Sequence, residues 1–358
     1  MGLILSHMTA IDAWRRTSAL GPFGVSGCLC PSTPEDSRNQ ALPRGPGRPK
    51  IAPPTISDLH LLDHYGVWMD SGIGILVTER ESRRALPNVT CHLCSSPLPA
   101  RSVHPLPLTG KRREDLCVCT PELALLQVAG TPSFSGPAGR IRLMRLIMEL
   151  CGTYRIVAGT THYGCPPLTS VAKIRTFIGR ARGVRGRRAL EKALSHALDN
   201  SASPAETRLA LMLSLPLRYG GEGLGKPVLN RTLPLTGAAR SLFGRDSITP
   251  DILFVVKGAR GRHFPVEYES RKFHSSEEQA EYDERRRNTY AAMGMSCFLA
   301  RPKHLSKLRE FDSMVATVRK NIAAEQRPKP AGYLSRKALL HSVLAEDMQM
   351  QGSETTDR

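Results

Sequence analysis

Two apolar segments separated by a short turn constrain the fold most strongly. Residues 248–256 (ITPDILFVV) and 264–273 (FPVEYESRKF) have the composition of β-strands, and the residues between them (KGARGR) are typical of a turn. The pattern predicts a β-hairpin. Asp251 lies on the first strand, and Glu267 and Glu269 project from one face of the second, because side chains alternate along a strand. We therefore expect the three carboxylates to converge.

Such a carboxylate cluster is costly without a cation, because like charges in a half-buried site repel and raise one another's pKa. Mg²⁺ relieves this repulsion, prefers oxygen ligands and activates both a phosphodiester and an attacking water. The pattern predicts a magnesium site on Asp251 and Glu267, and a salt bridge in the gap between them would argue against the ion. In the alternative interpretation, Glu267 and Glu269 are ordinary polar residues on the solvent face of an antiparallel strand.

A strong helix start marks a second domain. Ser203 can cap the helix, Pro204 suits its first position, and Glu206 can complete a capping box. A Gly- and Pro-rich stretch near the N-terminus is typical of a flexible arm. We expect an N-terminal segment with this arm at 1–55, a basic regulator-like domain at 56–200, a second domain at 201–305, and a helical segment with a polar tail at 306–358.

The chain carries 50 basic and 32 acidic residues, which gives a formal net charge of +18. This excess favours a polyanionic partner, since a protein gains affinity for nucleic acid by releasing counterions at each neutralised phosphate. Basic side chains are densest at 173–192, although a solvated helical surface would also explain them, because arginine favours helices. The arginines expected to contact nucleic acid in this segment are Arg180, Arg182, Arg185, Arg187 and Arg188.

Nine cysteines without a secretion signal argue against a disulfide framework, so we expect reduced thiols. The pairs Cys91-x-x-Cys94 and Cys117-x-Cys119 could supply four thiolates to zinc. The second pair directly precedes a helix start at Thr120, however, and is expected to end a short strand. We therefore expect buried thiols rather than zinc.

Apolar stretches in the chain are far shorter than the ~20 residues of a membrane span. The first residues also lack the basic start and the long apolar stretch of a secretion signal. We expect a cytoplasmic protein with no membrane partner. The sequence gives no signal for an oligomeric state.

The carboxylates belong to an ordered pattern that resembles the PD-(D/E)XK nuclease superfamily, and the nearest branch is similar to bacterial very-short-patch-repair endonucleases. The resemblance covers about 201–302. It implies that Asp251 and Glu267 hold Mg²⁺, with Glu206 as an outer ligand. Glu269 stands where most members have a water-activating lysine. An acidic residue at this position is usual in this branch. The pattern runs through Pro204, Glu206, Pro250, Asp251, Glu267, Glu269, His274, Asp283 and Arg286.

The same resemblance implies roles for nearby basic residues. Lys272, Arg271 or His274 would stabilise developing negative charge or position a water. Asp283 and Arg286 would lie near the site, where they orient other groups or contact phosphate. In the alternative interpretation, His274 is a surface residue, and the charged residues of the helix that carries Asp283 and Arg286 form exposed ion pairs.

Segments nearer the N-terminus resemble an abortive-infection antitoxin-like regulator module that precedes such a domain. They are 6–15 (SHMTAIDAWR), 119–129, 149–154 (ELCGTY) and 168–170, with 220–230 (GGEGLGKPVLN) at the junction. The resemblance implies that Cys119 and Cys151 belong to a fold pattern rather than to a metal site.

Together these patterns predict an α/β fold. We expect a restriction-endonuclease-like mixed sheet flanked by helices, preceded by a smaller α/β or mostly helical domain. The functional hypothesis is a Mg²⁺-dependent endonuclease that cuts DNA. Two alternatives are a catalytically inactive nucleic-acid-binding regulator of the antitoxin or defence type, and an accessory protein whose charge is incidental.

Overall fold

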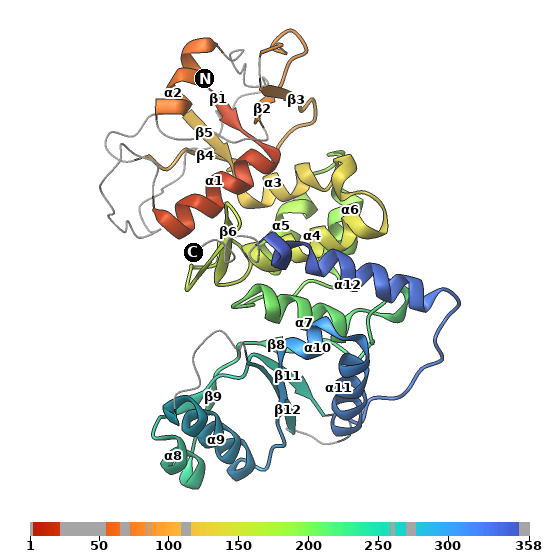
Figure 1. Cartoon of the computed structure of the whole chain (residues 1–358). Helices are drawn as coiled ribbons and strands as arrows, with labels where there is room; N and C mark the ends of the chain where they lie inside the picture. The colour runs from red at the N-terminus through yellow and green to blue at the C-terminus, as the bar shows by residue number, and fades with distance from the viewer. Residues whose placement is uncertain are drawn as a thin grey trace. The chain divides into compact units, whose positions relative to one another are not determined.

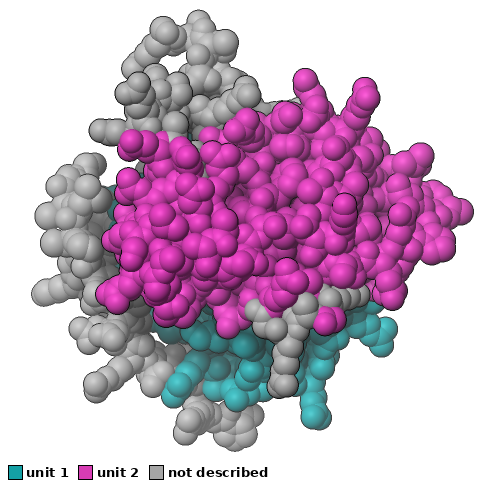
Figure 2. Space-filling view, turned by 90° about the horizontal axis from the view of Figure 1, so that it is seen from below, with its two compact units in different colours: residues 1–195 teal, residues 196–358 magenta. Residues whose placement is uncertain are grey.

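A computed structural model of the protein describes residues 3–21, 55–64, 72–83, 85–86, 88–108, 116–256, 258, 262–269 and 277–350. The chain divides into two compact units, Met1–Ser195 and His196–Arg358, which Figure 2 shows in different colours. Each unit combines helices with a sheet of mixed parallel and antiparallel strands (Figure 1). This confirms the expected α/β fold. A membrane span would need a helix longer and more apolar than any in the described part of the chain.

The sheet of the first unit has a central strand from the N-terminus of the chain. β1 (Leu3–Leu5) pairs in parallel with β5 (Leu116–Cys119) and antiparallel with β2 (Ile73–Val77). β3 (Val89–Leu93) and β4 (Val103–Pro105) complete the order β3-β2-β1-β5-β4. Every residue of β1 and β2 is buried, as in strands that are covered on both faces.

This pairing changes the expected domain boundaries. Residues 3–5 belong to the core of the first unit rather than to a separate segment at 1–55, because β1 bonds to strands on both of its sides. The first unit is therefore larger than we expected, and it ends at Ser195 rather than at residue 200.

Helices cover this sheet and fill the rest of the first unit. Thr120 caps α3, since its Oγ1 accepts a hydrogen bond from the Leu123 amide at 3.3 Å. The pair Cys117 and Cys119 ends β5 directly before that cap, as the sequence predicts. The elements are α1 (His7–Leu20), α2 (Ile56–His64), α3 (Pro121–Val128), a 3-10 turn (Pro132–Phe134), α4 (Gly136–Leu150), β6 (Tyr154–Val157), β7 (Thr160–Tyr163), α5 (Val171–Arg180) and α6 (Arg187–Leu194).

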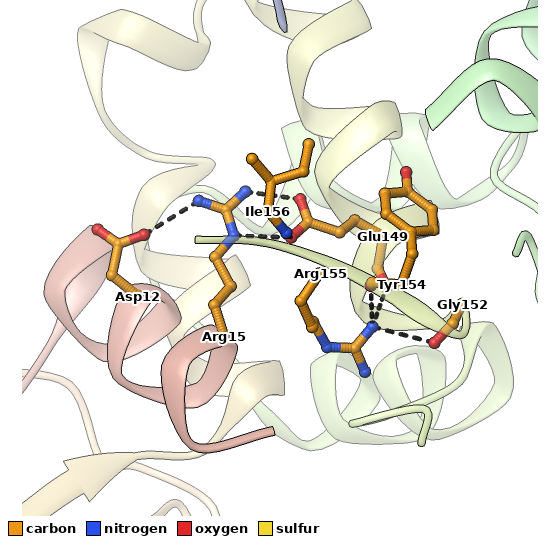
Figure 3. A network of polar contacts seen from close by, with 7 residues as sticks. All are labelled: Asp12, Arg15, Glu149, Gly152, Tyr154, Arg155 and Ile156. Carbon is orange, nitrogen blue, oxygen red and sulfur yellow. Dashed lines mark hydrogen bonds and ion pairs between the residues drawn. The ribbon is translucent and has the colours of Figure 1, made fainter. Parts of the chain in front are cut away.

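A buried ion pair joins α1 to α4 (Figure 3). Arg15 donates to both carboxylate oxygens of Glu149, at 2.8 Å from Nε and 2.6 Å from Nη2, and also to Asp12 at 3.0 Å. Glu149 Oε1 additionally accepts from the Ile156 amide at 3.2 Å. Arg155 is fully buried and donates to backbone carbonyls, including those of Glu149 and Gly152. The bidentate geometry satisfies charges that burial would otherwise penalise.

Hydrogen bonds link four of the segments that resemble the antitoxin-like module, while the fifth, 220–230, belongs to the second unit. Trp14 Nε1 donates to the Cys119 carbonyl at 2.8 Å. Thr169 Oγ1 donates to Glu122 Oε1 at 2.5 Å, and the Leu168 amide donates to the Leu150 carbonyl at 2.9 Å. These four segments, widely separated in sequence, therefore form one polar core.

The second unit contains the predicted hairpin. β11 (Ile252–Val255) pairs antiparallel with β12 (His263–Tyr268), with Phe254 opposite Phe264. β8 (Val228–Leu229) pairs antiparallel with β11, and β13 (Phe298–Ala300) pairs in parallel with β12. In Figure 1, α8 (Gly237–Phe243) and α9 (Glu277–Ala292) lie on one side of β11 and β12, and α11 (Leu308–Asn321) lies on the other. The expected mixed sheet flanked by helices is confirmed.

The first predicted strand is divided in the structure. Ser247–Ile248 forms β10, which pairs with β9 (Leu233–Pro234), and β11 starts only at Ile252. Pro250 lies at this break, where its missing N–H cannot contribute to a ladder. The second predicted strand ends at Tyr268, and residues 270–273 lie outside the described residues.

The C-terminal helices belong to the second unit rather than to a separate segment at 306–358. Lys337 of α12 (Tyr333–Met350) is 2% exposed and donates to Glu222 Oε1 at 2.6 Å. Tyr333 Oη donates to the same oxygen at 2.7 Å. These bonds tie α12 to the loop that follows α7 (Pro204–Ser214) and the 3-10 turn Leu217–Tyr219. A short helix, α10 (Pro302–Ser306), precedes α11.

We predict that Glu149→Gln destabilises the protein by about 2 kcal/mol, because it removes the bidentate charge partner of the largely buried Arg15 and leaves the ion pair with Asp12. Urea unfolding followed by circular dichroism measures this loss. Glu191→Gln is the matched control: Glu191 accepts from Arg187 at 2.9 Å on an exposed surface, so the loss should stay below about 0.5 kcal/mol. Equal losses in the two variants would contradict the role given to Glu149.

Candidate functional site

Three carboxylates from different elements lie near one another in the second unit. Glu206 comes from the first turn of α7, Asp251 directly precedes β11, and Glu267 lies in β12. Glu206 and Glu267 are each 7% exposed. All three belong to the predicted site, and their charges act on one another.

The helix start that places Glu206 matches the sequence prediction in part. Ser203 caps α7, since its Oγ accepts from the Glu206 amide at 3.1 Å. The Glu206 carboxylate reaches back to the Ala202 amide at 3.0 Å, one residue before the position of a standard capping box. Asn230 Nδ2 donates to the same oxygen, Oε2, at 2.7 Å. These bonds hold Glu206 toward β11.

Asp251 and Glu267 face each other across the hairpin. The Asp251 amide donates to Glu267 Oε2 at 3.3 Å, and the Tyr268 amide donates to Asp251 Oδ2 at 2.7 Å. Ile252 is opposite Val266 in the register, which places residues 251 and 267 side by side. The predicted convergence of these two residues is thus present.

Burial and mutual repulsion disfavour the ionised forms. The pKa of Asp251 is raised well above its ordinary value of 3.8, mainly by burial and then by the charges of Glu267 and Glu206. The pKa of Glu206 is also raised, mainly by burial, although its hydrogen bonds from Ala202 and Asn230 oppose the shift. If all three carboxylates were ionised, the cluster would carry more negative charge than Arg286 compensates.

Two residues of α9 contact Glu267 from the other side. Arg286 forms an ion pair with Glu267 Oε1 and donates to the Thr249 carbonyl at 3.1 Å. Tyr290 donates its hydroxyl to the same carboxylate oxygen. Burial opposes the charged form of Arg286, but the charge of Glu267 outweighs it and raises the pKa of the guanidinium. A salt bridge thus occupies one oxygen of Glu267, while Oε2 faces Asp251.

Glu269 does not join this cluster. It follows the end of β12, is partly exposed, and accepts from Arg301 Nε at 2.9 Å. Arg271, Lys272 and His274 lie outside the described residues, as does the side chain of Asp283. Their predicted roles stay predictions.

Sequence reasoning missed Tyr290, Asn230 and Arg301. Tyr290 lies four residues after Arg286, a spacing that places both side chains on one helix face. The sequence could therefore have indicated that Tyr290 lies next to Arg286. Asn230 ends the junction segment 220–230, but no local pattern connects it with Glu206. Arg301 meets Glu269 because β13 pairs with β12 in parallel, which is a tertiary feature.

The donor chemistry fits Mg²⁺ in its usual protein setting. Within the described residues, no group of three histidine, cysteine, aspartate or glutamate side chains has the geometry to hold a metal ion. Mg²⁺ commonly binds one or two carboxylates together with waters and substrate phosphates, rather than a complete protein cage. Asp251 and Glu267 supply such a pair of hard oxygen donors.

The cysteines of the first unit are arranged differently from a four-thiolate site. Cys91 lies on β3 and Cys117 and Cys119 lie on β5, with β2 and β1 between them. Three strand spacings amount to roughly 14 Å, too far for Cys91 to share one zinc ion with the β5 pair. Burial raises the pKa of the Cys119 thiol, and Gln127 Nε2 donates to its sulfur at 3.7 Å.

The predicted basic segment forms the end of α5, a turn and the start of α6. Arg180, Arg182, Arg185 and Arg188 are exposed, and Arg187 pairs with Glu191 on the surface of α6. These side chains are accessible to a polyanion.

Comparison with known protein families, curated proteins and solved structures returned no match for this chain. The geometry of its own residues therefore carries the functional argument.

We predict that the stability of the protein falls as pH rises through the titration of Asp251. Because the pKa of Asp251 is raised in the folded state, the folded protein holds this proton more tightly than the unfolded chain. The free energy of unfolding should therefore decrease from about pH 4 upward, until the pH passes the raised pKa.

Asp251→Asn should reduce this decline and make the protein more stable than wild type at pH 7, by about 1.4 kcal/mol per unit of pKa displacement. Urea unfolding in the presence of a chelator at several pH values measures the effect. Asp246→Asn is the control, since Asp246 is 81% exposed and pairs with Arg240 at the surface. The same pH dependence in wild type and Asp251→Asn would disprove the argument.

Proposed function

We propose that the second unit is a metal-dependent endonuclease domain that hydrolyses phosphodiester bonds in DNA. The observation that carries this proposal is the pairing of Asp251 with Glu267 across β11 and β12, beside the buried Glu206, where Arg286 is the cation seen to pair with the cluster among the described residues. If all three carboxylates were ionised, Arg286 alone would leave two negative charges uncompensated. A divalent cation has the charge that would neutralise this remainder with Arg286 still in place.

In this proposal Asp251 and Glu267 hold Mg²⁺, and Glu206 acts as an outer ligand. When bound, Mg²⁺ would polarise the phosphodiester and lower the pKa of a water. The hydroxyl of Tyr290 and the guanidinium of Arg286 fix the Glu267 carboxylate through Oε1, so that Oε2 keeps its orientation toward Asp251. Arg286 additionally offers positive charge next to the place where a phosphate would bind.

The residues around this centre complete the proposal. Glu269 lies outside the carboxylate cluster, is partly exposed and pairs with Arg301. Following the family resemblance, Lys272, Arg271 or His274 stabilises the charge that develops on the phosphate. The exposed arginines at the end of α5, in the following turn and in α6 bind the nucleic acid backbone, and the protein acts in the cytoplasm.

A second candidate function has its own support. The Arg286 ion pair and the Tyr290 hydroxyl already satisfy Glu267 Oε1, and protonation of Asp251 and Glu206 would remove the excess charge without a metal. On this reading the protein is a nucleic-acid-binding regulator that does not catalyse hydrolysis.

We predict that the full chain nicks supercoiled plasmid DNA in the presence of Mg²⁺ and not in the presence of a chelator. Asp251→Asn and Glu267→Gln should each lower the nicking rate by about 100-fold or more, because each removes a charged oxygen donor. Gel electrophoresis of the plasmid over time measures the rate. Asp246→Asn, an exposed carboxylate of the same unit, should keep the wild-type rate.

Intact plasmid with the wild-type protein, or equal nicking by Asp251→Asn, would refute the endonuclease proposal. Mg²⁺ should also raise the thermal unfolding temperature of the wild type and leave that of Asp251→Asn unchanged. This binding measurement separates loss of the metal site from loss of a later step.

For the first unit we predict DNA binding that weakens steeply with salt. The double variant Arg180→Gln/Arg182→Gln should reduce the slope of log affinity against log salt by about 2, if each arginine neutralises one phosphate. Fluorescence anisotropy with a labelled duplex measures the slope. If the wild-type protein does not nick DNA and Glu267→Gln still binds it, the result favours the regulator. No DNA binding at ~100 mM salt would count against both candidate functions.

A further inference from the structure

A cavity of about 460 Å³ lies in the first unit, far along the chain from the carboxylate site. Its walls are the turn after α3, the start of α4 and one face of α6. An adjoining cavity of about 720 Å³ shares Ala129, Gly130, Arg185, Arg188 and Ala189 with it. Volumes of this size are typical of small-ligand sites.

Every charged residue that lines the 460 Å³ cavity is cationic. These residues are Arg140, Arg185, Arg188 and Lys192. Arg188 and Lys192 are four residues apart on α6, so they project from the same helix face. Arg187 instead pairs with Glu191, which lines only the adjoining cavity. The cavity thus concentrates positive charge without an acidic side chain in its lining.

Close backbone contacts hold the walls of this cavity in place. Gly186 has φ +93°, and a Cβ there would lie 2.3 Å from the Leu126 carbonyl oxygen. At Gly139 a Cβ would lie 2.3 Å from the Phe134 carbonyl carbon. Glycine at these two positions lets the turn before α6 approach α3, and lets α4 approach the 3-10 turn. The backbone that carries the cationic side chains is therefore closely packed.

The lining also contains apolar and hydroxyl groups. Phe134 and Leu143 offer apolar surface, Thr131 donates its hydroxyl to the Val128 carbonyl at the end of α3, and Ser135 donates its hydroxyl to the Pro132 carbonyl. A site that combines several cations with apolar surface suits a ligand that has a phosphoryl group and an uncharged portion.

We infer that this cavity is an anion site that binds a phosphoryl group. The phosphoryl group comes either from a free nucleotide-sized molecule or from the backbone of a nucleic acid, since both present the same oxygens to arginine. The inference does not depend on the proposed endonuclease activity, because the cavity and the carboxylates belong to different units.

The test is isothermal titration calorimetry of the full-length protein with tripolyphosphate and, separately, with ADP, in the presence of a chelator. Arg185→Gln and Lys192→Gln should each weaken binding by about 10-fold. Arg175→Gln is the matched control, because Arg175 is exposed in the same region and does not line the cavity. It should change the affinity by less than about 2-fold.

Competition with a short DNA duplex identifies the source of the phosphoryl group. If tripolyphosphate displaces the duplex and the lining variants weaken both, the site binds the nucleic acid backbone. If duplex binding is insensitive to the lining variants, the site binds a small ligand. Lack of tripolyphosphate binding at about 1 mM, or equal losses in lining and control variants, would overturn the inference. Glu267→Gln should bind tripolyphosphate and ADP like wild type. Failure of the endonuclease proposal can therefore be distinguished from failure of the anion site.

Discussion

The second unit is organised around carboxylates that are buried with too little positive charge. Ionised side chains rarely occupy a protein interior unless hydrogen bonds and counter-charges replace water. Here the Tyr268 amide, the Ala202 amide and the Asn230 side chain each supply a donor, and Arg286 supplies the counter-charge. The start of α7, the break before β11 and the position of α9 all serve to bring these groups together.

The local part of this arrangement could be read from the sequence. Alternation along the strands predicted that Asp251 and Glu267 would lie together, and the Ser-Pro-x-Glu start placed Glu206 on the first turn of a helix. The strand break could have been read as well, because Pro250 cannot donate to a ladder. Glu269 was misjudged because it shares the face of Glu267 but lies beyond the last residue of β12, where Arg301 can reach it.

The non-local part could not be predicted in the same way. Arg286 and Tyr290 reach Glu267 only because α9 packs beside β11, where Tyr290 joins a core with Leu253 and Phe243. The first unit shows the same limit, since Arg15 and Glu149 are 134 residues apart in sequence. Short apolar segments such as β1 give a weak periodic signal, and only pairing on both sides reveals a central strand.

Arg286 and a divalent ion need not compete for the same charge. If the ion replaced Arg286, the three carboxylates would still leave one negative charge uncompensated in a buried site. If Arg286 remained alone, two would persist, and protons would have to bind where burial and repulsion raise the pKa of Asp251 and Glu206. With both cations present the charges balance. Glu267 can accommodate this arrangement, because Oε1 bonds to Arg286 and Tyr290 while Oε2 faces Asp251. On this argument the ion pair orients a ligand and does not close the site.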